Sequence, residues 1–237
     1  YSGGTEIGGG ILTGTPLHPM KPGALSGPVP GMGVAVMDDD GTALTPPCTG
    51  ELVVRKPSIG ITRGLWNDPQ RYLESYWARF PSIWVHGDRV QVDADGFWYV
   101  LGRSDDTLKI AGKRTGPSEV ESLVTATGLV AEVAAIGLPD SVKGSSLGIV
   151  ATLMPGVPAG DGTRREIAQA VVAGHGRAYV PTVILFVPDI PKTRNLKIMR
   201  RVVRATYLDE NPGDLSSMVN PESLDAIRQA RDNQNPH

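Results

Sequence analysis

The chain has 237 residues, which is enough for one large domain or two small ones with a buried core. Its 23 basic and 25 acidic side chains nearly cancel, so it lacks the net positive field that holds nucleic acid or an anionic membrane surface. A single cysteine, Cys48, excludes an internal disulfide framework and suits a reducing compartment, so we expect a cytoplasmic protein. No apolar run approaches the roughly 20 residues that span a bilayer, and we expect no membrane partner.

The chain begins inside a glycine-rich segment with no initiator methionine, and we expect it to be a fragment of a longer protein. The sequence then indicates β-structure, with strands expected at 51–54 and over most of 84–92. The Asp95-Gly96 dipeptide lies between two apolar runs and tolerates positive φ, so it predicts a β-hairpin. Together with a short helix over 68–79, these elements predict a small distorted β-barrel.

After Arg103 the pattern alternates between strands and helices, which predicts a compact α+β domain. Ser118 and Glu121 have the spacing of a capping box ahead of an amphipathic helix. The short polar connection at 104–106 divides the chain. We therefore expect an N-terminal part over residues 1–103, a hinge at 104–106 and a C-terminal domain over 107–237.

The first candidate site is the glycine-rich segment at the start of the chain. Gly3 and Gly4 allow the backbone to approach a phosphate closely, the Thr5 hydroxyl can bond a phosphate oxygen, and Glu6 can hold Mg²⁺. Alone, this pattern is weak because glycine-rich loops are common.

A second candidate site combines His86-Gly87-Asp88 with Gly102-Arg103. Asp88 can accept two hydrogen bonds from the vicinal hydroxyls of a ribose, and Arg103 can meet the same ribose or a phosphate without losing its charge. A surface salt bridge between Asp88 and Arg103 is an equally open interpretation. We expect His86 to be structural, because no second ligand residue lies at metal-binding spacing.

Two basic segments complete the set. In residues 108–121 a glycine loop with two cations runs into a helix N-terminus, a combination suited to an anionic ligand. In residues 191–201, Lys197 lies on a basic loop that follows an apolar strand and leads into a helix. A lysine there can carry positive charge to the oxygens of a reacting carboxylate and phosphate. The alternative for this segment, taken alone, is a solvated basic face.

In this order, the four motifs closely resemble the C-terminal third of acetyl-CoA synthetase-like acyl-CoA synthetases, AMP-forming members of the adenylate-forming ligase superfamily. The resemblance covers essentially the whole chain, including residues 66–72 and 211–216. It implies an α+β fold: the end of a large AMP-binding N-terminal domain with a small distorted β-barrel subdomain, then a mobile C-terminal domain. It also implies that the rest of the N-terminal domain precedes residue 1 and that the fragment alone is inactive.

The resemblance further implies ATP-dependent activation of a short- or medium-chain carboxylic acid to an acyl-adenylate, followed by transfer to coenzyme A with release of AMP. The expected cofactors are ATP, Mg²⁺ and coenzyme A. The implied site residues are Gly3, Gly4, Thr5, Asp88, Arg103 and Arg114 for the nucleotide, Glu6 for the metal, Ala111 and Gly112 for coenzyme A, Asp105 as the hinge and Lys197 as the adenylation lysine.

Two departures from the family pattern bear on activity. The pair Asn195-Leu196 replaces a pair that usually ends in glycine, which would stiffen the lysine loop. Gly3 stands where acetate-specific members carry a tryptophan, so we expect an acyl pocket open to longer acids. The alternatives are an enzyme that passes its acyl group to a carrier-protein thiol, an acetoacetate-CoA ligase, or a non-catalytic regulatory or docking module.

Overall fold

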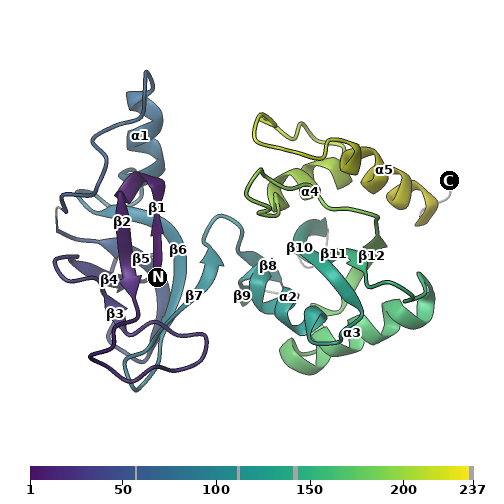
Figure 1. Ribbon diagram of the computed structural model, residues 1–237, viewed down its shortest axis with the longest axis horizontal. Helices are drawn as coiled ribbons and strands as arrows, with labels where there is room; N and C mark the ends of the chain where they lie inside the picture. Colours follow the sequence, from purple (N-terminus) through teal and green to yellow (C-terminus); the bar gives the residue numbers. More distant parts are fainter. Residues whose placement is uncertain (57, 111–112, 141–143, 235–237) are drawn as a thin grey trace. The chain divides into compact units, whose positions relative to one another are not determined.

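The computed structural model describes residues 1–56, 58–110, 113–140 and 144–234, which form two compact units (Figure 1). Unit 1 comprises Tyr1–Asp105 and unit 2 comprises Asp106–His237. The division lies within residues 104–106, where the sequence predicts a hinge, and rotation about that hinge stays a prediction. In the described ranges, no helix is both long and apolar enough to cross a bilayer.

Unit 1 is built from two antiparallel sheets and one α-helix. The larger sheet has the strand order β4-β5-β6-β7 and the smaller has the order β1-β2-β3. The 3₁₀ helix η1 joins β1 to β2. The bounds are Ser2–Gly4 (β1), Thr5–Ile7 (η1), Gly9–Thr13 (β2), Gly27–Pro28 (β3), Val34–Met37 (β4), Cys48–Val54 (β5), Pro69–Tyr76 (α1), Trp84–Val92 (β6) and Trp98–Arg103 (β7).

The two sheets are open, so the predicted β-barrel is wrong for the described part of unit 1. Closing a barrel requires continuous pairing between the outermost strands. Here β3 has only two residues, and the segment before it meets β7 through one isolated bridge between Leu25 and Trp98. The mixed α+β class is confirmed by the helices and sheets of both units.

The hairpin predicted at Asp95-Gly96 is confirmed, because β6 and β7 pair antiparallel on either side of it. Gly96 adopts φ +83°, and the Asp93 carboxylate accepts the backbone N–H groups of the two residues flanking Gly96 at 3.0 and 2.9 Å. The register set by the turn holds as far as Val90, where it shifts by one residue, and beyond this irregularity Asp88 lies directly opposite Arg103. The turn and the register shift together bring two predicted site residues to the same end of the hairpin.

Helix α1 packs its aromatic side chains on the core of unit 1. Asp68 caps the helix by accepting the backbone N–H of Arg71 at 3.1 Å, and a proline occupies the first turn, where its missing N–H costs nothing. Tyr76 stacks on the fully buried Trp84 of β6 with ring centroids 4.1 Å apart. This contact holds α1 against the strand that carries the second candidate site.

Unit 2 has three layers, with a sheet of order β10-β11-β12 between two pairs of helices (Figure 1). β10 runs antiparallel to β11, and β12 runs parallel to β11 after the α3 crossover. A hairpin of β8 and β9 precedes α2. The bounds are Leu108–Ile110 (β8), Lys113–Thr115 (β9), Pro117–Thr125 (α2), Val130–Asp140 (β10), Gly144–Leu153 (β11), Asp161–His175 (α3), Arg177–Tyr179 (η2), Pro181–Phe186 (β12), Arg200–Tyr207 (α4) and Glu222–Gln234 (α5).

The central sheet of unit 2 is apolar on both faces because helices cover both. Val133 and Ala135 of β10 belong to the buried cluster that includes residues of α2 and α3. Ala134 and Ile136 belong to the cluster that includes residues of α4 and α5. This alternation explains why β10 reads as a continuous apolar run rather than as alternating polar and apolar residues.

The capping box predicted for Ser118 and Glu121 is wrong. The N-cap of helix α2 is Gly116, two residues before Ser118, and Glu119 accepts the backbone N–H of Gly116 at 2.7 Å. Glu121 is buried instead. Its two oxygens accept hydrogen bonds from Nε and Nη2 of Arg200 at 2.6 and 2.5 Å, and Oε1 also accepts the N–H of Ala135 at 2.9 Å. Its hydrogen bonds raise the pKa of Arg200 above its ordinary value.

Removing the Glu121 charge should destabilise unit 2, because Arg200 would be left largely buried without its counter-ion. We expect Glu121→Leu to lower the free energy of unfolding by about 3 kcal/mol, and Glu121→Leu with Arg200→Met to recover much of that loss. The measurement is urea unfolding of the chain followed by helical circular dichroism. Glu166→Gln, an exposed change on α3, is the control, and an equal loss in that variant would contradict the argument.

Candidate functional site

Unit 1 brings two of the four predicted motifs into one polar cluster. Glu6 comes from η1, His86 and Asp88 from β6, and Arg103 from the end of β7. His86 lies between the two carboxylates, with Nδ1 3.6 Å from Glu6 Oε1 and Nε2 3.5 Å from Asp88 Oδ2. The cluster therefore joins residues from the first ten positions of the chain to residues about 80 and 100 positions later.

His86 is the buried centre of this cluster, with a side chain only 3% exposed. Burial lowers its pKa below the ordinary value, and the nearby carboxylates of Asp88 and Glu6 oppose that shift without reversing it. A neutral imidazole has a single N–H, so it can donate to only one of its two carboxylate neighbours. Its Nδ1 is buried without a hydrogen-bond partner in the described ranges, which leaves the Glu6 carboxylate free on that side.

Arg103 closes the other side of the cluster. Its Nη1 donates to the carbonyl oxygen of His86 at 3.0 Å and lies 3.5 Å from Asp88 Oδ1, while Nε donates to Asp105 at 3.1 Å. The guanidinium lies across the backbone of Gly87, where an added Cβ would approach Arg103 Nη2 to 2.6 Å. Gly87 also has φ +82°, so its backbone conformation and the guanidinium both favour glycine at this position.

Asp88 and Arg103 do form a salt bridge. The distance of 3.5 Å between Arg103 Nη1 and Asp88 Oδ1 is nevertheless long for a hydrogen bond. A carboxylate can accept several hydrogen bonds, and a guanidinium carries five N–H donors. Asp88 can therefore accept from a pair of vicinal hydroxyls while Arg103 holds a neighbouring anionic group. This chemistry suits a ribose that carries a phosphate.

The glycine segment has a packing role that the sequence did not indicate. A Cβ at Gly3 would lie 2.3 Å from the carbonyl oxygen of Gly9 in the paired strand β2, and a Cβ at Gly4 would lie 2.5 Å from the Glu6 carboxylate. Close packing of β1 on β2 therefore favours glycine at position 3, and the acyl pocket open to longer acids stays a prediction. Thr5 is exposed at the start of η1.

One carboxylate can serve as a partial Mg²⁺ ligand. Within the described residues, no group of three or more His, Cys, Asp or Glu side chains could hold a metal ion by itself. Mg²⁺ commonly keeps its waters and binds through one or two carboxylates together with substrate phosphates. Glu6, with its carboxylate free of hydrogen bonds from His86 Nδ1, fits that limited role.

In unit 2, Lys197 lies on a tight hairpin between β12 and α4. Lys192 and Ile198 form an isolated β-bridge, and the N–H of Thr193 donates to the carbonyl of Lys197 at 2.9 Å. The N–H of Leu196 donates back to Thr193 at 2.8 Å. These bonds define a three-residue hairpin loop, and such loops place their last residue in the left-handed region. Leu196 is that residue, with φ +58°.

Polar side chains fix the base of this hairpin. The Lys192 ammonium lies 2.8 Å from both Asp189 and Glu132, and hydrogen bonds to Asp189 and then Glu132 raise its pKa. The buried side chain of Asn220 accepts the Lys192 backbone N–H at 2.9 Å and donates to Asp189 at 2.6 Å. The sequence did not indicate these anchors, because Lys192 resembles any other cation of the basic run and its partners are distant in sequence.

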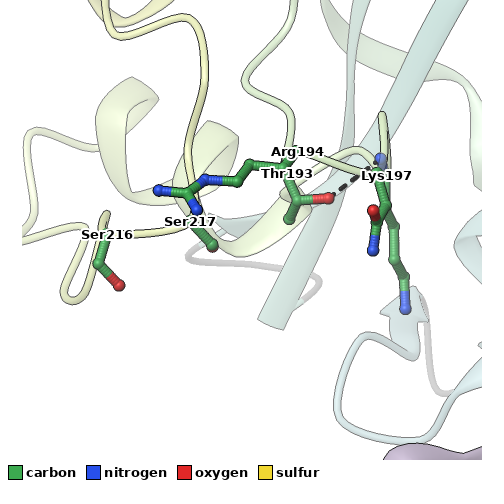
Figure 2. A pocket seen from close by; sticks show the side chains of 6 residues that line it. Thr193, Arg194, Lys197, Ser216 and Ser217 are labelled. Carbon is green, nitrogen blue, oxygen red and sulfur yellow. Dashed lines mark hydrogen bonds between the residues drawn. The ribbon is translucent and has the colours of Figure 1, made fainter.

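A pocket of about 770 Å³ lies between the hairpin and the loop before α5 (Figure 2). Figure 2 shows the Lys197 side chain extending away from Arg194 and the two serines, with the Thr193 hydroxyl accepting the Lys197 backbone N–H at 3.2 Å. Lys197 is exposed, and its ammonium has no ion pair with any residue that the structure describes. The pocket lining consists of Thr193, Arg194, Asn195, Lys197, Ser216 and Ser217.

The remaining predicted residues are placed only in part. Arg114 is exposed on β9, where it pairs with Lys109 across the hairpin of β8 and β9. Ala111 and Gly112, predicted to contact coenzyme A, lie outside the described residues. The predicted residues thus fall into a set in unit 1 and a set in unit 2, with Asp105 at the last position of unit 1.

Comparisons with known proteins agree with this arrangement. The AMP-binding enzyme C-terminal domain family matches residues 119–197, a span that ends on Lys197. The acetyl-coenzyme A synthetase of Methanothrix thermoacetophila is 38% identical over 227 residues, covering 94% of this chain and 34% of that protein. The 3-hydroxypropionyl-coenzyme A synthetase of Metallosphaera sedula is 40% identical over 232 residues, covering 95% of this chain and 35% of that protein. The solved acetoacetyl-CoA synthetase from Streptomyces lividans matches with a TM-score of 0.81 and 28% identity, over 97% of this chain and 35% of that chain.

Nearly the whole chain is therefore similar to acetyl-CoA synthetases and related acyl-CoA synthetases, and residues 119–197 match the AMP-binding enzyme C-terminal domain. It spans about a third of the length of the curated relatives that it matches. The family resemblance carried by the four motifs is confirmed, and the partial coverage fits the expectation of a fragment.

The geometry at Gly87 allows a matched test of the unit 1 cluster. Gly87→Ala and Gly96→Ala place alanine at nearly identical φ values of +82° and +83°, but only the former meets Arg103, since no atom lies within 4 Å of a Cβ at Gly96. We expect each change to lower stability by about 1 kcal/mol through backbone strain.

Only Gly87→Ala should also weaken AMP binding to the complete protein, by about tenfold, because it displaces the Arg103 guanidinium. Thermal unfolding and titration calorimetry measure the two effects. Equal AMP affinity in both variants would show that Arg103 does not contribute to the nucleotide site.

Proposed function

We propose that this chain is the C-terminal part of an ATP-dependent, AMP-forming acyl-CoA synthetase acting on a small carboxylic acid. The carboxylate attacks the α-phosphate of ATP, which forms an acyl-adenylate and releases pyrophosphate. The thiol of coenzyme A then attacks the acyl carbonyl, which forms the thioester and releases AMP. A preceding N-terminal domain would supply the rest of the site, since the matched relatives are about three times longer than this chain.

The observation that carries this proposal is the convergence of Glu6, Asp88 and Arg103 in unit 1. Asp88 would accept the ribose hydroxyls, and Arg103 would hold Asp88 in place and meet the nucleotide. Thr5 would bond the α-phosphate, with Gly3 and Gly4 keeping the backbone close to it. Mg²⁺, when bound, would neutralise phosphate charge, and Glu6 would be one of its ligands.

Unit 2 would supply the mobile part of the site. Lys197 would stabilise negative charge on the carboxylate and α-phosphate oxygens during adenylation, as a fixed positive charge aimed at the reacting centre does. Arg114 would lie near the phosphates, and Ala111 and Gly112 would line the coenzyme A channel. Asp105 would absorb the backbone rotation between the two half-reactions.

The acid itself is left open by the relatives, whose names include acetyl-, 3-hydroxypropionyl- and acetoacetyl-CoA synthetases. The structural similarity to the last favours acetoacetate as a second candidate substrate. An acyl transfer to a carrier-protein thiol would give the same first half-reaction without dependence on coenzyme A. Assays of AMP formation with and without coenzyme A, across these acids, separate the possibilities.

Lys197→Ala in the complete protein should lower carboxylate-dependent ATP–pyrophosphate exchange by about two orders of magnitude, because one preorganised charge is lost. Thioester formation from supplied acyl-adenylate should change far less. Arg165→Ala, which removes an exposed cation from α3, is the matched control. An equal loss in both half-reactions would reject the adenylation role, and absence of exchange in the wild type would indicate a non-catalytic module.

Asp105→Pro tests the hinge. Proline fixes φ at the boundary of the two units and also restricts the preceding residue, so it should trap one domain orientation. We expect one half-reaction to persist while the other falls sharply. Asp105→Asn, which removes the ion pair with Arg103 but leaves φ free, should keep both half-reactions. Normal rates in the proline variant would place the pivot elsewhere.

A further inference from the structure

A second pocket, of about 340 Å³, lies in unit 1 between the end of β5, the segment that leads into α1, α1 itself and the start of β6. All of its described lining residues fall within 54–84, so the pocket is formed by one unit alone. None of them belongs to the polar cluster of Glu6, His86, Asp88 and Arg103. The volume is within the range of pockets that hold small ligands.

Three aromatic side chains form one wall of this pocket. The rings of Trp77 and Trp84 meet edge to face with centroids 5.7 Å apart, and the Tyr72 ring lies 6.4 Å from the former and 6.1 Å from the latter. The Tyr72 hydroxyl donates to the carbonyl oxygen of Thr62 at 2.7 Å, which ties the wall to the segment before α1. Rings packed on one another in this way offer a flat apolar surface to a planar ligand.

The two tryptophans also carry unused hydrogen-bond donors. Both indole N–H groups are buried, and neither has a hydrogen-bond partner within the ranges that the structure describes. Buried donors are normally paired, because an unpaired one costs free energy of folding. An indole N–H can donate but cannot accept, so the partner that Trp77 and Trp84 lack is an acceptor.

The same pocket carries a concentration of positive charge. Arg55, Lys56 and Arg63 line it, and its described lining includes no acidic side chain. All three cations are exposed, and none forms an ion pair with a residue that the structure describes. The chain as a whole has slightly more acidic than basic side chains, so this local excess is not a consequence of composition. Three unpaired charges around one cavity favour an anionic ligand, and a dianion over a monoanion.

We propose that this pocket binds a small aromatic phosphate monoester. The three rings would contact its planar body, and Arg55, Lys56 and Arg63 would hold its dianionic head. A ligand oxygen would supply the acceptor that the buried indole N–H groups lack. The proposal concerns a site separate from the nucleotide cluster and does not depend on the catalytic roles proposed above.

Titration calorimetry of phenyl phosphate into the complete protein tests this site. The titration is made in saturating AMP, which occupies the proposed nucleotide site, and we expect a single saturable site for phenyl phosphate. Inorganic phosphate lacks the ring and phenol lacks the charge, so each should bind at least about tenfold more weakly. Absence of phenyl phosphate binding, or equal affinity for the ring-free phosphate, would overturn the proposal. Titration of AMP alone reports separately on the nucleotide site.

Substitutions then locate the bound ligand. Arg63→Gln should weaken phenyl phosphate binding by about tenfold, as loss of one charged hydrogen-bond donor does. Trp77→Phe keeps an aromatic ring but removes an N–H, and it should weaken binding severalfold. Ser58→Phe should block the pocket by filling it. Arg71→Gln, an exposed change on α1 outside the lining, is the control and should stay within about twofold.

Thermal unfolding of each variant verifies that a loss of binding does not come from a loss of structure. If Arg63→Gln and Trp77→Phe both bind phenyl phosphate as the wild type does, the ligand lies elsewhere and the proposal fails. An equal loss in Arg63→Gln and Arg71→Gln would also overturn it, because the effect would then come from general charge and not from contact in the pocket.

Discussion

The pairing of β6 with β7 is the constraint on which the polar cluster of unit 1 depends. Side chains alternate across a strand, so a slip of one residue would send Asp88 and Arg103 to the opposite faces of the sheet. The turn at Asp95-Gly96 fixes the pairing as far as Val90, because the Asp93 carboxylate accepts two N–H groups of the turn and Gly96 takes the positive φ it requires. A register shift of one residue between Val90 and Arg89 then places Arg103 opposite Asp88. The turn and the register shift of this hairpin take no part in any reaction, but they decide whether the Asp88 carboxylate and the Arg103 guanidinium lie in the same site.

Unit 2 holds one cation, Lys197, on a fixed hairpin without pairing it to a described carboxylate. Lys192 and Lys197 lie five positions apart on the same basic segment, but their surroundings differ completely. Lys192 is tied to two carboxylates and anchors the loop, while Lys197 projects from the loop without an ion pair among the described residues. The buried amide of Asn220 completes the anchor by satisfying backbone groups at the base of the hairpin. Rigidity at the base makes the exposed charge at the tip a well-placed one.

The sequence predicted features that depend on short-range patterns and missed those that depend on distant partners. The hairpin at Asp95-Gly96 and the α+β texture of unit 2 follow from local turn chemistry and apolar periodicity. The capping box failed because Glu119 and Glu121 both lie near a helix start, and only tertiary packing against Arg200 distinguishes them. The barrel failed because strand length, which sequence patterns define poorly, decides closure. Most of the candidate site was indicated by motifs, but its anchors were not, since Lys192 meets Glu132 across 60 positions of sequence.

Gly87 and Leu196 both have positive φ, but one position is occupied by glycine and the other by a residue with a large side chain. At Gly87 the guanidinium of Arg103 fills the space of a side chain, so glycine satisfies both the backbone and the packing. At Leu196 no neighbour excludes a side chain, and the hairpin accepts strain of roughly 1–2 kcal/mol, a modest fraction of the stability of a typical domain. The fold can therefore carry this strain without losing the hairpin.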